Sequence, residues 1–532
     1  MQVSHTFTPQ SAVFDEDNLV SCAGLVPVMA LAEQAGLSEL LANKIHIAAP
    51  RVKSGSANPA GKLATLIAGM CAGADYIDDV DLVRAGGMKT LFHRVYAPST
   101  VGTLLREFTF GHARQLDSVL AEHLAGLCER VNLLPGAQMR AFVDIDSLVR
   151  PVYGHHKQGA SFGHTKIAGK QVLRKGLSPL VTTISTDTAP PLVTGIRLRA
   201  GKTNSGKGAA RMVAQAITTA RAAGVSGLIT VRGDSAYGCR AVVGTCRRYG
   251  AVFSLVLTRN SAVQRAINAI SEDAWTPVQY PGAVRDPDTG AWISDAEVAE
   301  TTYTMAESGT GAITARLIVR RVIDANQPAD GLFPIWRYHP FFTNSTEPAT
   351  DADITHRRHA IIETTFADLI DGPLAHIPSG RFGANSAWAI CAGIAHNCCA
   401  RPRPWPAPAT AARAGRPCAV TWSTSPPAWP DPNANRSCTY PPTGPGNPPG
   451  SPCGTTPSAD DPAPKPPPTR PDNQDPDRKS WADQRPTHAA TSHNQDQPLN
   501  PPTQGLSVES GLGHRNVACV TRFRHHQVHH QQ

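Results

Sequence analysis

The sequence has few aromatic residues and lacks the features of an exported or membrane protein. Aromatic residues make up 6% of its 532 residues. The first twenty residues contain no basic stretch followed by an apolar run, so we expect no signal peptide. No stretch is long and apolar enough for us to expect a membrane-spanning helix. These absences predict a soluble protein in a reducing cytoplasm, with no membrane partner.

The cysteines lack the spacing of a metal site or of a disulfide framework. The chain has 12 cysteines and no C-x-x-C pair. Cys398 and Cys399 are adjacent, which suits neither a pair of zinc ligands nor an ordinary disulfide. In a reducing cytoplasm we expect most of these cysteines to serve as small buried residues.

Basic residues exceed acidic ones, and the prolines are unevenly distributed. Lys and Arg number 50 against 42 Asp and Glu, a net charge of +8. Such a balance permits a polyanionic partner such as nucleic acid. Most of the 46 prolines follow Arg401, so the chain contains two regions of different composition.

The region 401–532 is Pro-rich and has no apolar periodicity, as in DPAPKPPPTRPDNQDPDRKS. Such a segment cannot bury enough apolar surface to offset its chain entropy, so we expect a disordered tail. Its Pro, Ala, Arg, Gly, Thr and Ser content is also typical of GC-rich DNA read in a wrong frame. A frameshift near residue 400 is therefore the alternative to a genuine tail.

Residues 1–138 are expected to form a helical N-terminal region of the kind that often binds DNA. Leu63, Leu66, Ile67 and Met70 fall on one helical face. Another helix is predicted to start at Pro98-Ser99, with Ser99 as its N-cap. Nothing in these helices identifies which one would contact DNA.

Residues 139–400 are predicted to form an α/β domain built on a mixed sheet. Strand candidates alternate with helix candidates, which indicates a sheet covered by helices. A β-rich lobe is expected to be inserted at about 270–345, and a single long helix at 353–372 follows it. The expected strands are 141–149, 172–185, 190–200, a strand ending at Asp234, and 251–258; the expected helices are 209–224 and 241–250.

Three acidic positions in this domain are candidate metal ligands. Asp144 and Asp146 alternate in FVDIDS and so share one face of a strand. Asp234 follows a β-branched run, at the edge of a sheet where ligands often bind. On a helix His356, His359 and Glu363 would lie on one face. Carboxylates from two strands and a late helix could converge on two Mg²⁺ ions, which prefer oxygen ligands.

VDIDS, VRGDSAY and HRRHAIIETTFADLIDGPLAHIPSGRFGANSAWAICAGIAHN, in this order, resemble the three blocks of bacterial insertion-sequence DDE transposases. The resemblance covers roughly residues 20–400. It implies an RNase H-like core with Asp146, Asp234 and Glu363 as catalytic metal ligands. Asp144 remains the alternative to Asp146. Many relatives have Tyr, Arg and Lys where this chain has His356, His359 and Ile370.

The resemblance also implies an activity, a cofactor and partners. The activity would be metal-dependent cleavage of DNA at the element's ends and strand transfer into target DNA. The cofactor would be two Mg²⁺ or Mn²⁺ ions. The partners would be double-stranded terminal inverted repeats and target DNA, bound by a self-associated protein at the nucleoid. Expected phosphate contacts are Arg357, Arg358, His359, Lys202 and Lys207.

Two alternatives remain open on the sequence. GKTNSGKG has Gly201, Gly206 and Lys207 at the spacing of a phosphate-binding loop, which would indicate a nucleotide-binding protein. However, Gly208 stands where Mg²⁺ coordination calls for Ser or Thr. The second alternative is an inactive, DNA-binding transposase remnant, which the composition of the tail suggests.

Overall fold

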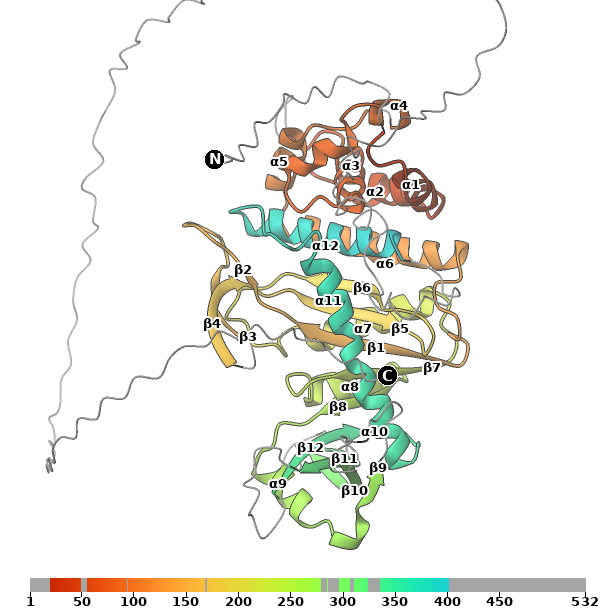
Figure 1. Ribbon diagram of the computed structural model, residues 1–532, viewed down its shortest axis with the longest axis vertical. Coiled ribbons are helices and arrows are strands. Elements are labelled where there is room, and N and C mark those ends of the chain that lie inside the picture. The colour runs from red at the N-terminus through yellow and green to blue at the C-terminus, as the bar shows by residue number, and fades with distance from the viewer. Residues whose placement is uncertain are drawn as a thin grey trace, which may run out of the picture. The chain divides into compact units, whose positions relative to one another are not determined.

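A large mixed sheet dominates the computed structural model, which describes residues 20–48, 55–92, 94–167, 170–278, 285, 296–306, 311–323 and 335–400. The region 401–532, for which we expect disorder, lies outside the described residues. The nine strands run in the order β6-β5-β1-β7-β8-β12-β11-β10-β9 (Figure 1). They are β1 (Arg140–Ser147), β5 (Leu180–Ser185), β6 (Leu192–Arg197), β7 (Leu228–Gly233), β8 (Val252–Val256), β9 (Thr276–Val278), β10 (Ala296–Met305), β11 (Ile313–Ile323) and β12 (Trp336–Thr343).

The centre of this sheet contains both strand directions. β7 runs parallel to β1, and β8 runs parallel to β7. β5 is antiparallel to β1 and β6 is antiparallel to β5, as hairpin connections require. β12 then pairs with β8 in the antiparallel direction. The predicted mixed α/β fold is confirmed.

Helices cover both faces of the sheet, which explains why its central strands are almost entirely buried. On one face α7 and α8 pack against β1, β7 and β8 in one hydrophobic core. On the other face Val181, Val193 and Ile196 of the sheet share a core with α11 and α12. The helices are α7 (Ala209–Ala222), α8 (Arg240–Arg248), α9 (Ser261–Asn268), η2 (Glu272–Ala274), α10 (Ala349–Arg357), η3 (Arg358–Ile361), α11 (Ile362–Ile370) and α12 (Phe382–Cys398).

The N-terminal helices pack mainly in the second of these cores, and residues 124–134 contribute to the first. Leu63, Leu66, Ile67 and Met70 are fully buried in the second core, together with Trp388 of α12. The described part of residues 20–134 therefore packs on the α/β region that contains the large sheet. The helices are α1 (Leu25–Gln34), α2 (Leu37–Lys44), α3 (Pro59–Cys71), η1 (Asp78–Val83), α4 (Met88–Leu91), α5 (Pro98–Arg106) and α6 (Phe110–Arg130).

One helix start differs from its prediction. α5 begins at Pro98, with Ala97 as the N-cap in an extended conformation, so the expectation of Ser99 as N-cap is wrong. Proline at the first helical position has its φ already set and has no N–H to satisfy, so it can begin a helix without a capping side chain.

Two other segments differ from the expected elements. The segment 172–185 divides at Ser178 and Pro179 into β4 (Lys170–Leu177) and β5, which belong to different sheets. The segment 353–372 is two α-helices, α10 and α11, joined by the 3₁₀ helix η3. Within the expected β-rich insertion at about 270–345, the strands β9 to β12 extend the main sheet through the β8–β12 pairing.

A small second sheet, β2-β4-β3, lies beside the large one (Figure 1). It consists of β2 (Arg150–Pro151), β3 (Ser161–Ile167) and β4. It arises entirely from the connection between β1 and β5.

Among the described residues no single helix combines the length and apolar character needed to cross a bilayer, although α1 and α2 taken together do, with a bend of 56° between them.

Candidate active site

Asp144 is part of a buried ion pair in the middle of the sheet. Its two carboxylate oxygens accept hydrogen bonds from Nε and Nη2 of Arg232 on β7, at 2.7 and 2.8 Å. Both side chains are 1% exposed. The Arg232 guanidinium also lies 4.0 Å from the centre of the Phe142 ring and donates to the carbonyl oxygen of Thr355 at 2.9 Å. The charge of Asp144 is therefore compensated by a structural partner.

Asp146 lies two residues further along β1, on the same face, and its surroundings are different. Its Oδ1 accepts a hydrogen bond from the backbone N–H of Ser147 at 2.6 Å. Burial, followed by the negative charges of Asp234 and Glu363, raises the pKa of Asp146 to about 7, against opposing effects from the Ser147 N–H and Arg199. Asp146 thus has two carboxylates and one arginine in its electrostatic neighbourhood.

Asp234 lies directly after β7, where the strand ends, and its side chain is exposed. Its Oδ1 accepts from the N–H of Ala236 at 2.9 Å, and its carbonyl accepts from the N–H of Tyr237 at 3.0 Å. This turn holds the carboxylate at the strand end. A Cβ at Gly233 would lie 3.0 Å from the Cγ2 of Ile145 on β1, so a larger residue here would require the Ile145 side chain to shift.

Glu363 lies in the first turn of α11 and is exposed. Glu363 contributes to the raised pKa of Asp146, so α11 brings it into the neighbourhood of the strand carboxylates. In the described part of the chain, no group of three or more His, Cys, Asp or Glu side chains is already arranged to hold a metal ion.

The two histidines before Glu363 are buried or partly buried, whereas Glu363 is exposed. His356 is 5% exposed, stacks on Phe341 at 4.3 Å between ring centres, and has Nδ1 2.9 Å from the Ser254 hydroxyl. Burial lowers the pKa of His356 well below its usual value, so the ring is neutral. η3 winds by about 120° per residue instead of 100°. Over its four residues the 3₁₀ turn therefore rotates Glu363 away from the face of His356.

The expected phosphate contacts around this helix have varied surroundings. Arg358 is about half-exposed and forms an ion pair with Asp187 at 3.0 Å. His359 is partly buried, and its Nδ1 donates to the carbonyl of His356 at 2.7 Å. Arg357 is also partly buried. Ile370 packs against the core that α11 shares with the N-terminal helices, which explains an apolar residue at this position.

The loop 201–208 is built around an arginine rather than around a phosphate. Nη1 of Arg199 donates to the carbonyl oxygens of Asn204, Ser205 and Lys207, at 3.4, 2.7 and 3.2 Å. A phosphate-binding loop instead directs N–H groups inward. The nucleotide-binding alternative is therefore not supported. Gly201 is needed for a different reason, since a Cβ would collide with the carbonyls of Ser161 and Gly176.

Arg199, Tyr237 and Ser147 are neighbours of Asp146 that the sequence analysis missed. Arg199 is 6% exposed and Tyr237 is fully buried. Burial and then the charge of Asp146 raise the pKa of Tyr237. Ser147 Oγ donates to Ser205 Oγ at 3.3 Å, which joins β1 to the loop. In GIRLRAG two arginines alternate, and this pattern alone does not distinguish the buried one.

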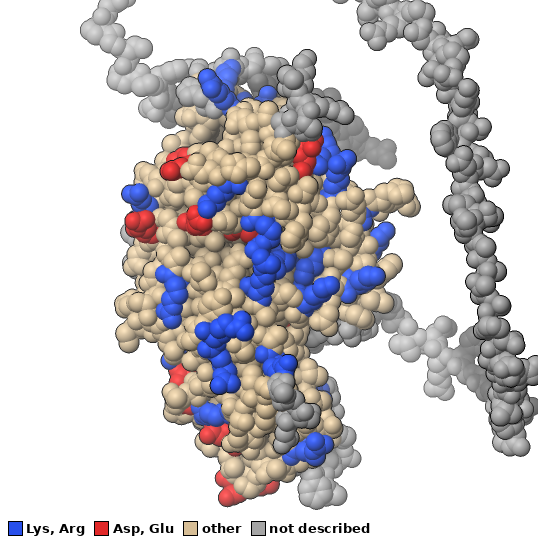
Figure 2. All heavy atoms as spheres, turned by 180° about the vertical axis from the view of Figure 1, so that it is seen from behind, with Lys and Arg blue, Asp and Glu red and all other residues tan. Residues whose placement is uncertain are grey.

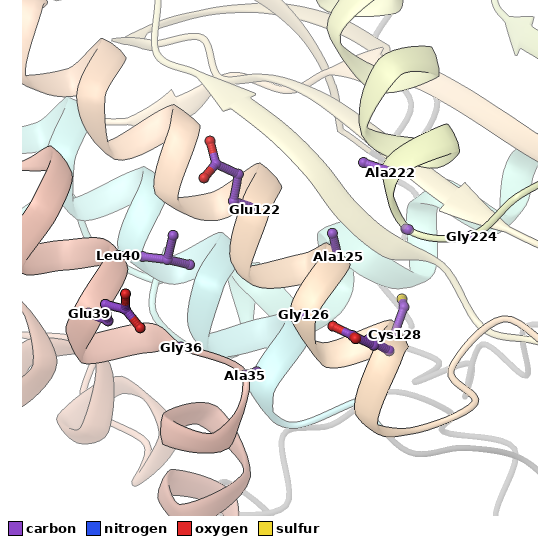
Figure 3. Close-up of a pocket in the computed structure, with 12 residues that line it drawn as sticks. Ala35, Gly36, Glu39, Leu40, Glu122, Ala125, Gly126, Cys128, Ala222 and Gly224 are labelled. Carbon is purple, nitrogen blue, oxygen red and sulfur yellow. The ribbon is translucent and has the colours of Figure 1, made fainter.

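A separate cavity of about 560 Å³ lies between α2, α6 and the end of α7 (Figure 3). Glu39, Glu122 and Glu129 line it, together with small residues such as Gly126. Lys44 pairs with Glu122 at 2.7 Å. Asp146, Asp234 and Glu363 do not line this cavity, and its acidic lining does not suit a phosphate backbone.

The comparisons with known proteins agree with the three sequence blocks. No curated protein matches the chain. The model of the family described as transposase DDE domain group 1 matches residues 8–363. This match covers more than half of the chain and includes the positions of all three carboxylates. The chain therefore belongs to the DDE transposase domain family, group 1.

Proposed function

We propose that this transposase cuts DNA at the ends of its mobile element and joins the freed 3′-hydroxyls to target DNA, using Asp146, Asp234 and Glu363. The observation that carries the proposal is the parallel pairing of β1 and β7, whose ends carry Asp146 and Asp234; the raised pKa of Asp146, caused by burial and then by Asp234 and Glu363, supports it. Carboxylates that repel one another in a partly buried place are a site that a cation would stabilise. Asp144 is not part of this set, because Arg232 neutralises it.

We propose that residues 139–400 form an RNase H-like core. The order β6-β5-β1-β7-β8, with β5 antiparallel to β1 and with β7 and β8 parallel to it, supports this proposal. In this arrangement β1 and β7 are neighbours, and the carboxylates after their buried stretches lie at one edge of the sheet. Glu363 would approach these two carboxylates from α11, in the helical layer on one face of the sheet.

The donor set suits Mg²⁺ or Mn²⁺, because all three candidate ligands are hard carboxylate oxygens. Two such ions, when bound, would activate the attacking hydroxyl and stabilise the departing oxygen. The chain's own residues prepare the site. The Asp234 turn and the loop held by Arg199 fix the strand ends, and the Asp144–Arg232 pair ties α10 to the sheet through Thr355.

The cationic side chains around the site would contact the DNA backbone. Lys202 and Lys207 lie in the loop that Arg199 holds, and Arg357, Arg358 and His359 precede α11. Contacts of this kind position DNA without reading its sequence. Because two element ends must be joined, we expect at least two copies of the protein to assemble with the DNA.

The test is Mg²⁺-dependent nicking of terminal-repeat DNA by the full-length chain and by Asp146→Asn, Asp234→Asn and Glu363→Gln. Each variant keeps the shape of the side chain and removes its charge. Loss of a metal ligand should reduce the rate roughly a thousandfold or more. Glu129→Gln, an exposed carboxylate at the separate cavity, is the matched control and should nick like the parent.

Two results would contradict the proposal. The first is that the parent nicks the DNA and that the Asp234→Asn and Glu363→Gln variants nick it equally well. The second is a parent that binds terminal-repeat DNA but never nicks it, even with the reading frame beyond codon 400 corrected. That result would support the inactive-remnant alternative.

A further inference from the structure

The sheet β2-β4-β3 contains a two-stranded ribbon that is anchored beside the candidate active site. The backbone N–H of Lys202 donates to the Ser161 hydroxyl at 2.8 Å, and Leu177 bridges Ala200. At Gly163 a Cβ would collide with the carbonyl of Gly201. The base of the ribbon therefore packs directly on the loop that Arg199 holds near Asp146.

On the face opposite to these contacts, the ribbon presents two apolar and two basic side chains to solvent. Phe162 pairs with Lys175, and His164 pairs with Leu173. Residues directly opposite each other in an antiparallel pair share a face, and the face alternates along the strand. These four side chains therefore form one surface, the ribbon face. Phe162 is 63% exposed and Leu173 is 56% exposed, and Lys175 and His164 are exposed as well.

The sequence around the ribbon is basic to an unusual degree. From Ser147 to Thr186 the chain contains no Asp or Glu. The region continues this bias, because Asp187 is the single acidic residue between Asp146 and Asp234. The Lys and Arg residues of the stretch 147–186 are Arg150, Lys157, Lys166, Lys170, Arg174 and Lys175. Figure 2 shows that Lys and Arg also gather across the middle of one face of the molecule.

We propose that the ribbon face is a DNA-binding arm that contacts duplex DNA next to the bond being cut. This inference rests on the proposed function and names a surface for its substrate. Duplex DNA carries about one negative charge per 1.7 Å of its axis, which complements a stretch without acidic residues. Lys175 would contact a phosphate, and Phe162 and Leu173 would pack on sugars or against a base step in the minor groove.

Charge favours DNA over a second copy of the chain as the occupant of this face. A ribbon that paired with its own copy would bring Lys175 and its neighbours against like charges, which is unfavourable. An apolar protein partner would not account for the absence of acidic residues from the stretch 147–186. The ribbon is also anchored to the loop next to Asp146, so DNA held at the carboxylates would pass close to it.

The test compares neighbouring residues on opposite faces of β4 in the full-length protein. Lys175→Gln removes a charge from the ribbon face, and Arg174→Gln removes one from the other face. Affinity for terminal-repeat duplex is measured in Ca²⁺, to prevent cutting, over a range of salt concentrations. Loss of one phosphate contact should reduce the salt slope by about 0.9, or about fivefold in affinity at 0.15 M salt. Arg174→Gln should leave the affinity and the salt slope unchanged.

A second pair of variants tests the apolar contacts in the same way. Phe162→Ala should weaken duplex binding by roughly tenfold with the salt slope unchanged, because it removes apolar contact area and no charge. Val172→Ala, on the opposite face of β4, should bind like the parent. Both side chains are exposed, so folding should be preserved in both variants.

The outcomes separate this inference from the proposed function. Equal affinities for the parent, Lys175→Gln and Phe162→Ala would overturn the arm, even if Asp146→Asn abolished nicking and so supported the function. Equal losses of DNA affinity in Lys175→Gln and Arg174→Gln would show that DNA does not bind through the ribbon face alone, and would overturn the inference. Self-association of the DNA-free protein that Phe162→Ala abolishes, in sedimentation experiments, would assign the face to a second copy instead.

Discussion

Asp144 and Asp146 lie two residues apart on one face of β1 and have opposite electrostatic surroundings. Asp144, deep in the sheet, faces the guanidinium of Arg232. Asp146, near the strand end, faces the charges of Asp234 and Glu363. One carboxylate is therefore compensated from within the fold, and the other requires a proton or a cation from outside. The comparison shows that the missing counterion, rather than acidity or burial alone, distinguishes the proposed ligand Asp146 from the structural residue Asp144.

The largest effect should come from breaking the compensated pair. Arg232→Leu leaves Asp144 buried without a partner and should lower the free energy of unfolding by about 3–5 kcal/mol. The measurement is urea-induced unfolding at pH 7. The double variant Asp144→Leu/Arg232→Leu is the control, and it should recover at least half of the loss. A double variant as unstable as the single one would show that Arg232 does not act through Asp144.

The second effect has the opposite sign and concerns Asp146. Since its pKa is raised from 3.8 to about 7, the folded state keeps a proton that the unfolded chain loses. Its contribution to stability therefore decreases as pH rises from about 4 to about 7. Asp146→Asn removes this decrease and should be more stable than the parent by about 2 kcal/mol at pH 8 without metal. If Asp146→Asn and the parent differed in free energy of unfolding by the same amount at pH 4 and at pH 8, the raised pKa of Asp146 would be contradicted.

The third prediction concerns competition between metal and proton. A cation must displace the proton from Asp146, so the apparent Mg²⁺ affinity should rise by up to about tenfold per pH unit below 7 and level off above it. The increase in Tm with added Mg²⁺, measured from pH 5.5 to 8.5, reports this affinity. Asp146→Asn should show little increase at any pH. If the Mg²⁺-induced increase in the Tm of the parent were independent of pH, Asp146 would not be a metal ligand.

The smallest effect on stability should come from an exposed ion pair near the same helix. Arg358 and Asp187 are both about half-exposed, so Arg358→Ala should change the free energy of unfolding by about 0–1 kcal/mol. Its DNA affinity should nevertheless fall equally for all sequences, with a lower salt slope. Binding isotherms on terminal-repeat and unrelated duplexes give both quantities. A loss confined to the terminal repeat would indicate base recognition instead.

Much of the fold follows from local pattern, and its departures have local causes. The apolar face of α3 and the strands that end at Ser147 and Gly233 were predictable from periodicity. The break between α10 and α11 was not, because the residues of η3 suit an α-helix equally well. The pairing of β8 with β12 was also not predictable from local pattern, because it brings together Leu255 and Phe342, which lie far apart in the sequence.

The candidate site was predictable in its residue types but not in its electrostatics. The order of the sequence blocks predicted Asp146, Asp234 and Glu363 as the site, with Asp144 as the alternative to Asp146. The choice between Asp144 and Asp146 depends on Arg232, which lies 88 residues from Asp144. The spacing of glycines and Lys207 resembled a phosphate-binding loop, because spacing does not specify whether carbonyl or N–H groups point inward. That direction is determined by the burial of Arg199.

The core shared by the N-terminal helices and α12 has a consequence for how the protein is synthesised. Leu25 and Cys399 belong to the same buried cluster, although almost the whole described chain separates them. During translation the core cannot close until α12 has left the ribosome. Until then the apolar faces of α1, α3 and α5 remain without their final partner, and such surfaces promote aggregation. The yield of folded protein should therefore depend on the speed of elongation through the first 400 codons and on chaperones that cover these helices.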